Sequence, residues 1–296
     1  MPHNITNQAS TPILFTKPAN GASGGKSATE QPDGWAPIFD AAMKGDCAAI
    51  EKLVKSPEDT QVRFLGVTPL LLATIAGRLE AVKLLLKKGA NIGDRDDDSR
   101  TIFTLALDSD KKFIADELIK LYPHTTVTDP RLDKGKEWLT QQFNDICSHI
   151  QDPKSQPPKK VLDYLLAWKF PDDKNRPVLE VYWEHILLRY IGDVPRDIQR
   201  NYSPDLNLAL IGTFDQILKG HAGIRESARL LNSKLPTTGY TILDTVVRSD
   251  NHWVTERWSY DNKHGIKVED GIDSFLIDTI KGKITDKMIN YHVQGA

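Results

Sequence analysis

Cysteine is nearly absent from this chain of 296 residues, which contains only Cys47 and Cys147. Two scattered cysteines form neither a disulfide framework nor a metal-ligand cluster, so we expect no metal site and a reducing compartment. Long apolar runs are also missing, and none approaches the roughly 18 residues that a membrane helix needs. The N-terminal residues lack the basic start and the long apolar core of a secretory signal peptide. The sequence therefore predicts neither a membrane span nor secretion through such a signal.

An excess of charge of either sign is lacking as well. Lys and Arg number 38 and Asp and Glu number 40, which gives a formal net charge of −2. This balance argues against a dedicated nucleic-acid surface. Hydrophobic residues make up 40% and charged residues 26% of the chain, as in folded globular proteins, and the length suggests about two domains.

The segment 1–34 has few side chains that can build a core. It is rich in Asn, Thr, Ser, Gly, Pro and Ala, so we expect it to be disordered. Within it, the run from Gly21 to Ser27 has some features of a phosphate-binding loop. Such a loop needs a glycine where Asn20 stands, a strand before it and an apolar helix after it, and the sequence provides none of these. We interpret the run as a flexible linker.

A repeat with a period near 33 residues is the most informative pattern. In its best copy, Gly66–Asp94, Thr68 and Pro69 open a short helix, Gly77 ends it and a second apolar helix follows. Weaker copies carry the same residue types on both sides: Pro37, Ala41 and Gly45 before it, and Thr101, Ala106 and Leu118 after it. A turn and two helices per unit at this period are typical of stacked ankyrin repeats, which the segment 35–124 resembles. One unit cannot bury its apolar face alone, so about three are needed, and three are visible here.

The resemblance to ankyrin repeats implies an all-α solenoid that binds a protein partner. Leu71 stands where these repeats usually carry a histidine, which predicts a weaker polar network between the repeats. The turns are the predicted contact surface, because repeat turns project on one face. The residues that we expect to contact the partner are Arg63, Arg95, Asp96 and Asp97. The acidic run that continues through Asp98 has a second interpretation as a solvated turn.

The segment 125–176 is predicted to hold two helices and a linker. Trp138, Phe143 and Ile146 recur at helical spacing within 129–150, and a second helix is expected at 161–168. The connection at 151–158 is rich in proline, which breaks helices. We expect the two helices to extend and cap the repeats, since they would shield the apolar side of the last one.

From about residue 177 the pattern changes. Helical spacing of apolar residues predicts helices at 178–191 and 220–231, with a short helix that Asp193 caps between them. Strand-like runs lie at 206–211, 240–248, 253–260, 266–278 and 284–293. Helices first and strands afterwards predict an α+β fold in which helices pack on a curved antiparallel sheet.

Several segments in this part carry a family resemblance through their order. They are Gly192 with Asp193, Tyr202 to Asp205, Gly220 to Arg225, Asp270 to Ile277, Gly282 to Ile284 and Ile289 to Tyr291. With them, residues 177–296 resemble the SnoaL-like, nuclear transport factor 2-like superfamily, a cone of sheet wrapped around helices. The resemblance implies an apolar pocket at one end of the cone and, often, a dimer formed through the sheet. Some members are ketosteroid isomerases, polyketide cyclases or dehydratases and many others only bind, so the fold alone does not decide the function.

The resemblance to the isomerases also names positions for catalysis. Their base falls near Leu210, which cannot take a proton, and their oxyanion-binding tyrosine falls near His185. Asp273 is the one acid that matches their set. Both His185 and Asp273 have a second interpretation, as packed or hydrogen-bonded polar groups without a catalytic role. We therefore do not expect ketosteroid isomerase activity.

Glu256 is a further candidate, because it alternates with Val254 and Trp258 and so shares one sheet face with them. If that face lines the cone, Glu256 is desolvated, as a general acid or base in an apolar pocket requires. If the face points outward, Glu256 pairs with a cross-strand Lys or Arg. The predicted catalytic candidates are Glu256, Asp273 and His185, and the predicted pocket residues are Trp183, Leu210, Trp258, Phe275, Asn290 and His292.

The leading hypothesis is a two-module binding protein that needs no cofactor. The repeats bind a protein partner, and the cone binds a small apolar ligand or forms a homodimer. An enzyme of the isomerase, lyase or hydrolase type is the alternative, and a dimeriser that raises the avidity of the repeats is a third. The combination of modules suggests a bacterial protein that stays in the cytoplasm or is delivered into a host cell.

Overall fold

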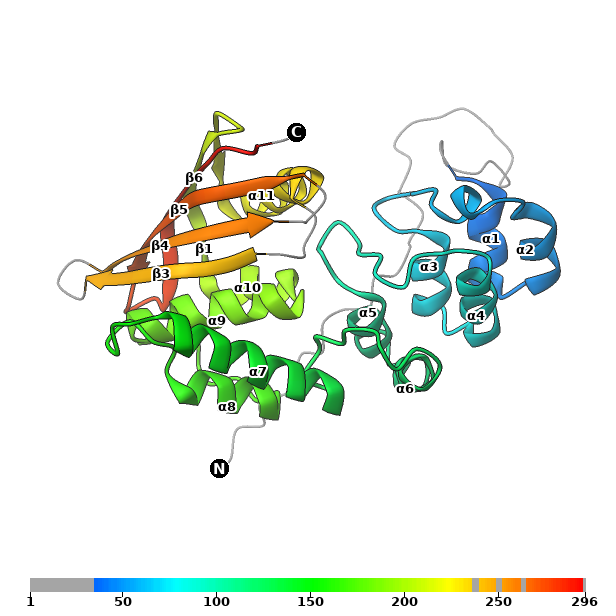
Figure 1. Cartoon of the computed structure of the whole chain (residues 1–296), viewed down its shortest axis with the longest axis horizontal. Helices are drawn as coiled ribbons and strands as arrows, with labels where there is room; N and C mark the ends of the chain where they lie inside the picture. Colours follow the sequence, from blue (N-terminus) through cyan, green and yellow to red (C-terminus); the bar gives the residue numbers. More distant parts are fainter. Residues whose placement is uncertain (1–34, 236–239, 249–251, 262–264, 295–296) are drawn as a thin grey trace, which may run out of the picture. The chain divides into compact units, whose positions relative to one another are not determined.

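The computed structural model describes residues 35–235, 240–248, 252–261 and 265–294. The chain divides into two compact units (Figure 1). The first comprises residues up to Asp96 together with Thr101–Thr125, and the second comprises Asp97–Arg100 together with the chain from Thr126 onward. The expected disorder at 1–34 and the linker run from Gly21 to Ser27 lie outside the described residues.

The first unit is built from helix pairs. The described helices are α1 (Pro37–Lys44), α2 (Cys47–Leu53), the 3-10 turn η1 (Pro57–Thr60), α3 (Pro69–Ile75), α4 (Leu79–Lys87), α5 (Ile102–Asp108) and α6 (Lys112–Leu121). The first helix of each later pair starts at a threonine cap: Thr68 accepts a hydrogen bond from Leu71 N (3.4 Å) and Thr101 from Thr104 N (3.1 Å). Helices α1, α3 and α5 pack side by side, as the expected solenoid requires.

Helices α7 (Asp133–His149) and α8 (Lys159–Ala167) belong to the second unit. Their apolar faces, including Leu139, Phe143 and Leu165, join the same hydrophobic core as the sheet of that unit. The sequence interpretation expected these helices to cap the repeats. An apolar stripe does not name the surface that covers it, and this one packs on the core of the second unit. A role of these helices as a cap on the repeats stays a prediction.

Helix α9 (Val178–Ile191) lies at the centre of the second unit and is buried almost all round. Its Trp183 indole N–H donates to the carbonyl of Ser155 between α7 and α8 (3.0 Å), while the neighbouring Tyr182 reaches Glu256 on the sheet. A helix with apolar residues on every side is stable only when it is covered on every side. Helix α9 is therefore the middle layer between the helices α7 and α8 and the sheet.

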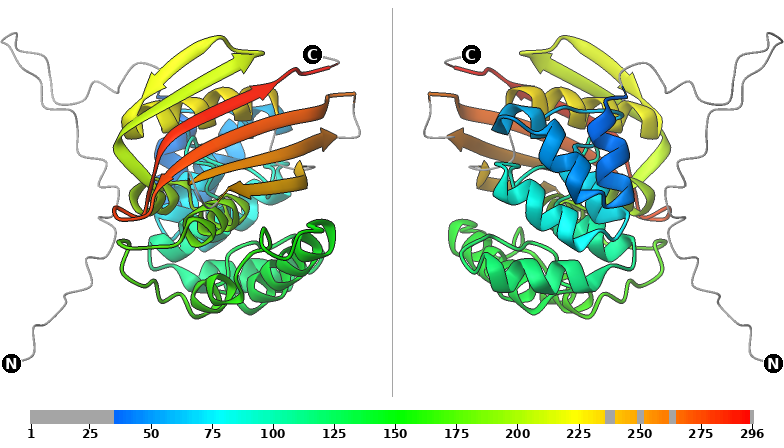
Figure 2. Two further views of the ribbon diagram at one scale, coloured as in Figure 1. Left: turned by 90° about the vertical axis from the view of Figure 1, so that its left-hand side faces the viewer. Right: turned by 90° about the vertical axis from the view of Figure 1, so that its right-hand side faces the viewer.

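The sheet has six strands in the order β2-β1-β6-β5-β4-β3 among the described residues, and it twists over α9 and α10 (Val194–Asn201) (Figure 2). Helix α11 (Gly220–Lys234) packs against β1 and β2. The strands are β1 (Tyr202–Gly212), β2 (Gln216–Lys219), β3 (Tyr240–Arg248), β4 (Trp253–Asp261), β5 (Lys267–Asp278) and β6 (Lys283–Tyr291). This α+β arrangement confirms the fold class expected from the sequence.

Two details of the sheet differ from expectation. The pair β1–β6 is parallel, whereas all other neighbouring pairs are antiparallel. The parallel pair arises because β6 inserts between β1 and β5, a choice of neighbour that strand propensity does not encode. Strand β2 was not expected, since its four residues are too few to show an alternating pattern.

No helix within the described ranges is long and apolar enough to cross a membrane.

Candidate functional site

Two acidic side chains face the interior of the second unit from adjacent strands. Glu256 on β4 and Asp273 on β5 are direct partners in the antiparallel register, and their exposed fractions are 1% and 6%. The Tyr182 hydroxyl on α9 donates a hydrogen bond to Glu256. Glu256 therefore lies on the inner face, and the alternative in which it faces outward does not hold.

Asp273 is held by a second set of groups. The Trp258 indole N–H donates to its Oδ1 (2.9 Å), and the Lys287 ammonium lies 3.2 Å from its Oδ2. Burial raises the pKa of Asp273, and the charge of Lys287 opposes that rise. The Lys287 side chain is 9% exposed, and its ammonium sits 4.5 Å from the centre of the Phe275 ring, a cation–π contact. The inner face of the sheet thus carries an ion pair beside two aromatic side chains.

Tyr291 on β6 supplies a polar group of a different kind. The residue is 1% exposed, and its hydroxyl has no hydrogen-bond partner among the described residues. Its ring lies 5.4 Å from that of Trp258, the residue that donates to Asp273. Burial, with a smaller effect from Asp273, raises the pKa of Tyr291 above its usual value, so the hydroxyl keeps its proton at neutral pH. A protonated buried hydroxyl without a partner can still donate and accept a hydrogen bond.

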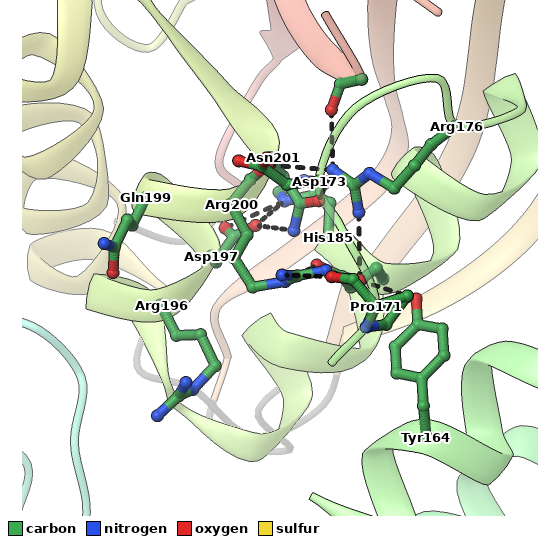
Figure 3. A network of polar contacts seen from close by, with 12 residues as sticks. Tyr164, Pro171, Asp173, Arg176, His185, Arg196, Asp197, Gln199, Arg200 and Asn201 are labelled. Carbon is green, nitrogen blue, oxygen red and sulfur yellow. Dashed lines mark hydrogen bonds and ion pairs between the residues drawn. The ribbon is translucent and has the colours of Figure 1, made fainter. Parts of the chain in front are cut away.

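His185 on α9 lies in a neighbouring network (Figure 3). Its Nδ1 is 3.0 Å from the Asp197 carboxylate, and the Tyr202 hydroxyl is 3.3 Å from the ring. Burial lowers the pKa of His185 to about 4, although Asp197 acts in the opposite direction. The imidazole is therefore neutral at pH 7, and the described contacts tie it to α10 and β1.

The same network continues away from His185 (Figure 3). The Arg176 guanidinium is 2% exposed and donates to the carbonyls of Arg200 and Gly282 and to the Asn201 side chain. Glu184 accepts from the Arg200 guanidinium at 2.6 Å and from the Tyr164 hydroxyl at 2.7 Å. These bonds fasten α9, the end of α10 and the turn between β5 and β6 to one another. They position the inner helix under the sheet.

The predicted pocket residues fall into three groups. Trp258, Phe275 and Leu210 are buried on the inner face of the sheet. Trp183 is buried as well, but its indole points to the loop between α7 and α8. Asn290 and His292 are exposed and alternate with the buried Ile289 and Tyr291, so the structure does not bring them into the interior.

Three interior residues were missed by the sequence interpretation: Tyr182, Lys287 and Tyr291. A signal existed for Lys287, since it stands two and four positions before Ile289 and Tyr291 and therefore shares their face. The sequence identifies Tyr182 only as an apolar helix residue and Tyr291 only as a strand residue. What surrounds each hydroxyl group depends on residues from distant parts of the chain, which local patterns do not show.

In the first unit the predicted partner-binding residues have local roles. The Arg63 guanidinium donates to the backbone carbonyls of Gly66 (2.8 Å) and Arg95 (2.9 Å). Asp96 is 7% exposed, so its carboxylate is not a free surface group. Asp97 is exposed and is grouped with the second unit. The structure therefore places Arg63 in backbone contacts, Asp96 in the interior and Asp97 at the surface, and a contact of these turns with a partner stays a prediction.

Within the described residues, no group of three His, Cys, Asp or Glu side chains is arranged to hold a metal ion.

Comparison with known families matches residues 26–129 to ankyrin repeats in three copies, which confirms the repeats expected from the sequence. A search of curated proteins returned no match. Among solved structures, the chain is similar to a protein of unknown function with a cystatin-like fold from Methylobium petroleophilum PM1. The two share 17% identity over 38% of this chain and 75% of that chain, with a TM-score of 0.31.

Two further solved structures show similarity at the same low level. A protein assigned to the SnoaL-like polyketide cyclases from Shewanella putrefaciens CN-32 has 11% identity over 42% of this chain and 82% of that chain, with a TM-score of 0.31. The ankyrin repeat domain of human ASB11 has 17% identity over 58% of this chain and 72% of that chain, with a TM-score of 0.26. The chain joins ankyrin repeats, matched over residues 26–129, to an α+β unit in which helices pack against a six-stranded sheet among the described residues.

Proposed function

We propose that this chain is a two-module binding protein. The ankyrin repeats bind a protein partner, and the α+β unit binds a small, mostly apolar ligand that carries one hydroxyl or carbonyl oxygen. The bacterial origin and the delivery into a host cell suggested by the combination of modules stay predictions.

The Tyr291 hydroxyl is the observation that carries the ligand proposal. A buried hydroxyl without a hydrogen bond costs about 1–3 kcal/mol in proteins, and Tyr291 is both 1% exposed and without a partner among the described residues. A ligand oxygen that bonds to it would recover that cost. The Trp258 ring, 5.4 Å from that of Tyr291, is aromatic and suits an apolar ligand body.

A differential scanning fluorimetry screen tests the ligand proposal. The full chain is screened against neutral apolar compounds that bear one hydroxyl or carbonyl group, and each hit is measured by calorimetry on the wild type and on Tyr291→Phe. We expect a hit whose affinity falls about 10-fold or more in the variant, the value of one hydrogen bond near 1.4 kcal/mol. Equal affinity for both proteins would rule out Tyr291 as the polar contact.

An enzyme is the second candidate, and the pairing of Glu256 with Asp273 favours it. Two carboxylates at neighbouring register positions on adjacent strands can serve as acid and base when their environments differ. Here Tyr182 donates to one, and Trp258 and Lys287 hold the other. Mass spectrometry of a bound compound after incubation tests this candidate. Conversion that is lost in both Glu256→Gln and Asp273→Asn would support it, whereas a compound recovered unchanged supports binding alone.

A homodimer through the sheet is a further proposal of the same kind. Ile211, Ile272 and Met288 are large apolar side chains that are exposed on β1, β5 and β6. In the sheet, Ile211 and Ile272 are both register partners of Asn290, so Ile211, Asn290 and Ile272 form one row across the exposed face, two residues from Met288 on β6. Light scattering tests the dimer: Ile272→Lys should convert it to a monomer, and a wild type that is already monomeric would exclude it.

A further inference from the structure

The hairpin at 64–67 in the first unit has an unusual residue at its tip. Phe64 and Val67 exchange both backbone hydrogen bonds, at 3.0 and 3.1 Å, and form an isolated bridge. Both residues between them are left-handed, with φ of 46° for Leu65 and 78° for Gly66. A two-residue turn with both central residues at positive φ is of type I′, for which asparagine, aspartate and glycine are the preferred residues.

Leucine is disfavoured in this conformation, because its Cβ approaches the following carbonyl oxygen. Burial of the side chain does not compensate, since Leu65 is 73% exposed. The other exposed large apolar residues described in the first unit are all more covered: Leu53, Val62, Phe113 and Leu121 are 38%, 38%, 50% and 49% exposed. An apolar side chain that is strained and solvated in the free protein has no stabilising role there, and such strain is characteristic of functional positions.

The base of the hairpin is rigid. The Phe64 ring packs edge-on against Trp35, with 5.0 Å between the ring centres, and lies 6.0 Å from Phe39. Below the tip, the Arg63 guanidinium bonds to the carbonyls of Gly66 and Arg95, which ties the turn to the next repeat. A side chain presented on a fixed base loses little conformational freedom when a partner covers it.

We propose that Leu65 is the anchor through which the repeats bind their protein partner, by inserting into an apolar pocket on the partner's surface. This inference rests on the proposed function of the repeats and deepens it. It assigns the energy of binding to one apolar side chain at the tip, and it makes Arg63 a positioning residue that holds the turn.

The partner is captured first with the full chain, by a photo-crosslinking amino acid placed at position 65 and, as the control, at position 121. Its affinity is then measured by calorimetry, after purification, for the wild type, Leu65→Asn, Leu65→Met and Leu121→Asn. Asparagine fits the left-handed turn, so Leu65→Asn folds and its Tm rises, yet the affinity falls about 10- to 100-fold, as the loss of one buried leucine predicts. Leu65→Met keeps the wild-type affinity within about threefold, because methionine leaves an apolar side chain at the tip of the hairpin. Leu121→Asn also keeps it within about threefold, because Leu65 is unchanged.

Three results would overturn the inference: unchanged affinity in Leu65→Asn, an equal loss in Leu121→Asn, or a crosslinked product that is a second copy of this chain. In the first two cases a protein partner still binds, so the proposed function of the repeats survives while the anchor does not. If the purified full chain binds no protein at all, both proposals fail.

Discussion

Removal of the Tyr291 hydroxyl should stabilise the free protein, which is the opposite of what most core substitutions do. The phenol oxygen is buried without a partner among the described residues, and its desolvation costs about 1–3 kcal/mol. Tyr291→Phe removes that cost and leaves a void of one oxygen atom, which subtracts roughly a few tenths of a kcal/mol. We therefore expect the free energy of unfolding to rise by about 1–2 kcal/mol, with a Tm increase of about 2–4 °C for each kcal/mol in a unit of this size.

Tyr182→Phe is the matched control for this experiment. It removes the same atom from a tyrosine that is also fully buried, but the Tyr182 hydroxyl donates to Glu256. Its loss leaves the carboxylate with one donor fewer and should destabilise the protein by about 1.5–3 kcal/mol, the range for a hydrogen bond to a charged group. Urea denaturation of both variants, followed by Trp fluorescence and circular dichroism, measures the two changes.

Tyr291→Phe should raise the free energy of unfolding, whereas Tyr182→Phe should lower it. If Tyr291→Phe destabilised the protein by 1 kcal/mol or more, as Tyr182→Phe does, its hydroxyl would have a partner in the native state. The ligand proposal would then lose the observation that carries it.

Three further perturbations test the interior and the network around it. Burial lowers the pKa of His185 from near 6.5 to about 4, so between these pH values the unfolded chain binds a proton at His185 and the folded chain does not. The free energy of unfolding should therefore fall by about 3 kcal/mol as the pH drops from 6.5 to 4. Lys287→Met leaves Asp273 buried without its cation and should cost about 3–5 kcal/mol at pH 7, and less as the pH is lowered, because burial raises the pKa of Asp273 and favours its protonated form. Gly282→Ala should cost at least about 2 kcal/mol, because φ is +65° and an added Cβ would lie 2.0 Å from the carbonyl oxygen of Asp173.

Each of these predictions has a control measured by the same denaturation assay. His185→Gln should flatten the pH dependence between pH 6.5 and 4, and a slope equal to that of the wild type would contradict the assignment to His185. A double variant, Lys287→Met with Asp273→Leu, should recover most of the stability lost in Lys287→Met, since no unpaired charge remains. Gly265→Ala has φ of +102°, but no described residue lies within 4 Å of the added atom. It should cost less than Gly282→Ala, and equal costs would show that the contact with Asp173 is unimportant.

The sequence predicts those elements that local signals define. Thr68 and Pro69 start a helix and Gly77 ends one, so the repeats could be placed from residues within each unit. The late strands were found because turn residues separate runs of strand-forming residues. In contrast, the parallel β1–β6 pair and the packing of α7 and α8 depend on which surfaces meet, and an apolar stripe carries no such information.

Local patterns also predict only some of the side chains that face the interior of the second unit. Alternation grouped Glu256 with Trp258, and both are buried. On β6 the same alternation places Ile289 and Tyr291 on the buried face. Asn290 and His292 lie on the opposite, exposed face, so their polarity did not indicate a place in the interior. Lys287 was passed over since lysine is seldom buried. The Tyr291 hydroxyl has no partner among the described residues, and no sequence pattern predicts this, because it depends on which side chains meet in the folded interior.

A crystal structure of the full chain, soaked with the best compound from the screen, tests the central claim most directly. The account predicts density for the compound against the inner face of the sheet, with its oxygen within about 3 Å of the Tyr291 hydroxyl and its apolar body against Trp258. A Tyr291 hydroxyl bonded to a protein group, with side chains filling the space around it and the compound bound elsewhere or absent, would contradict it.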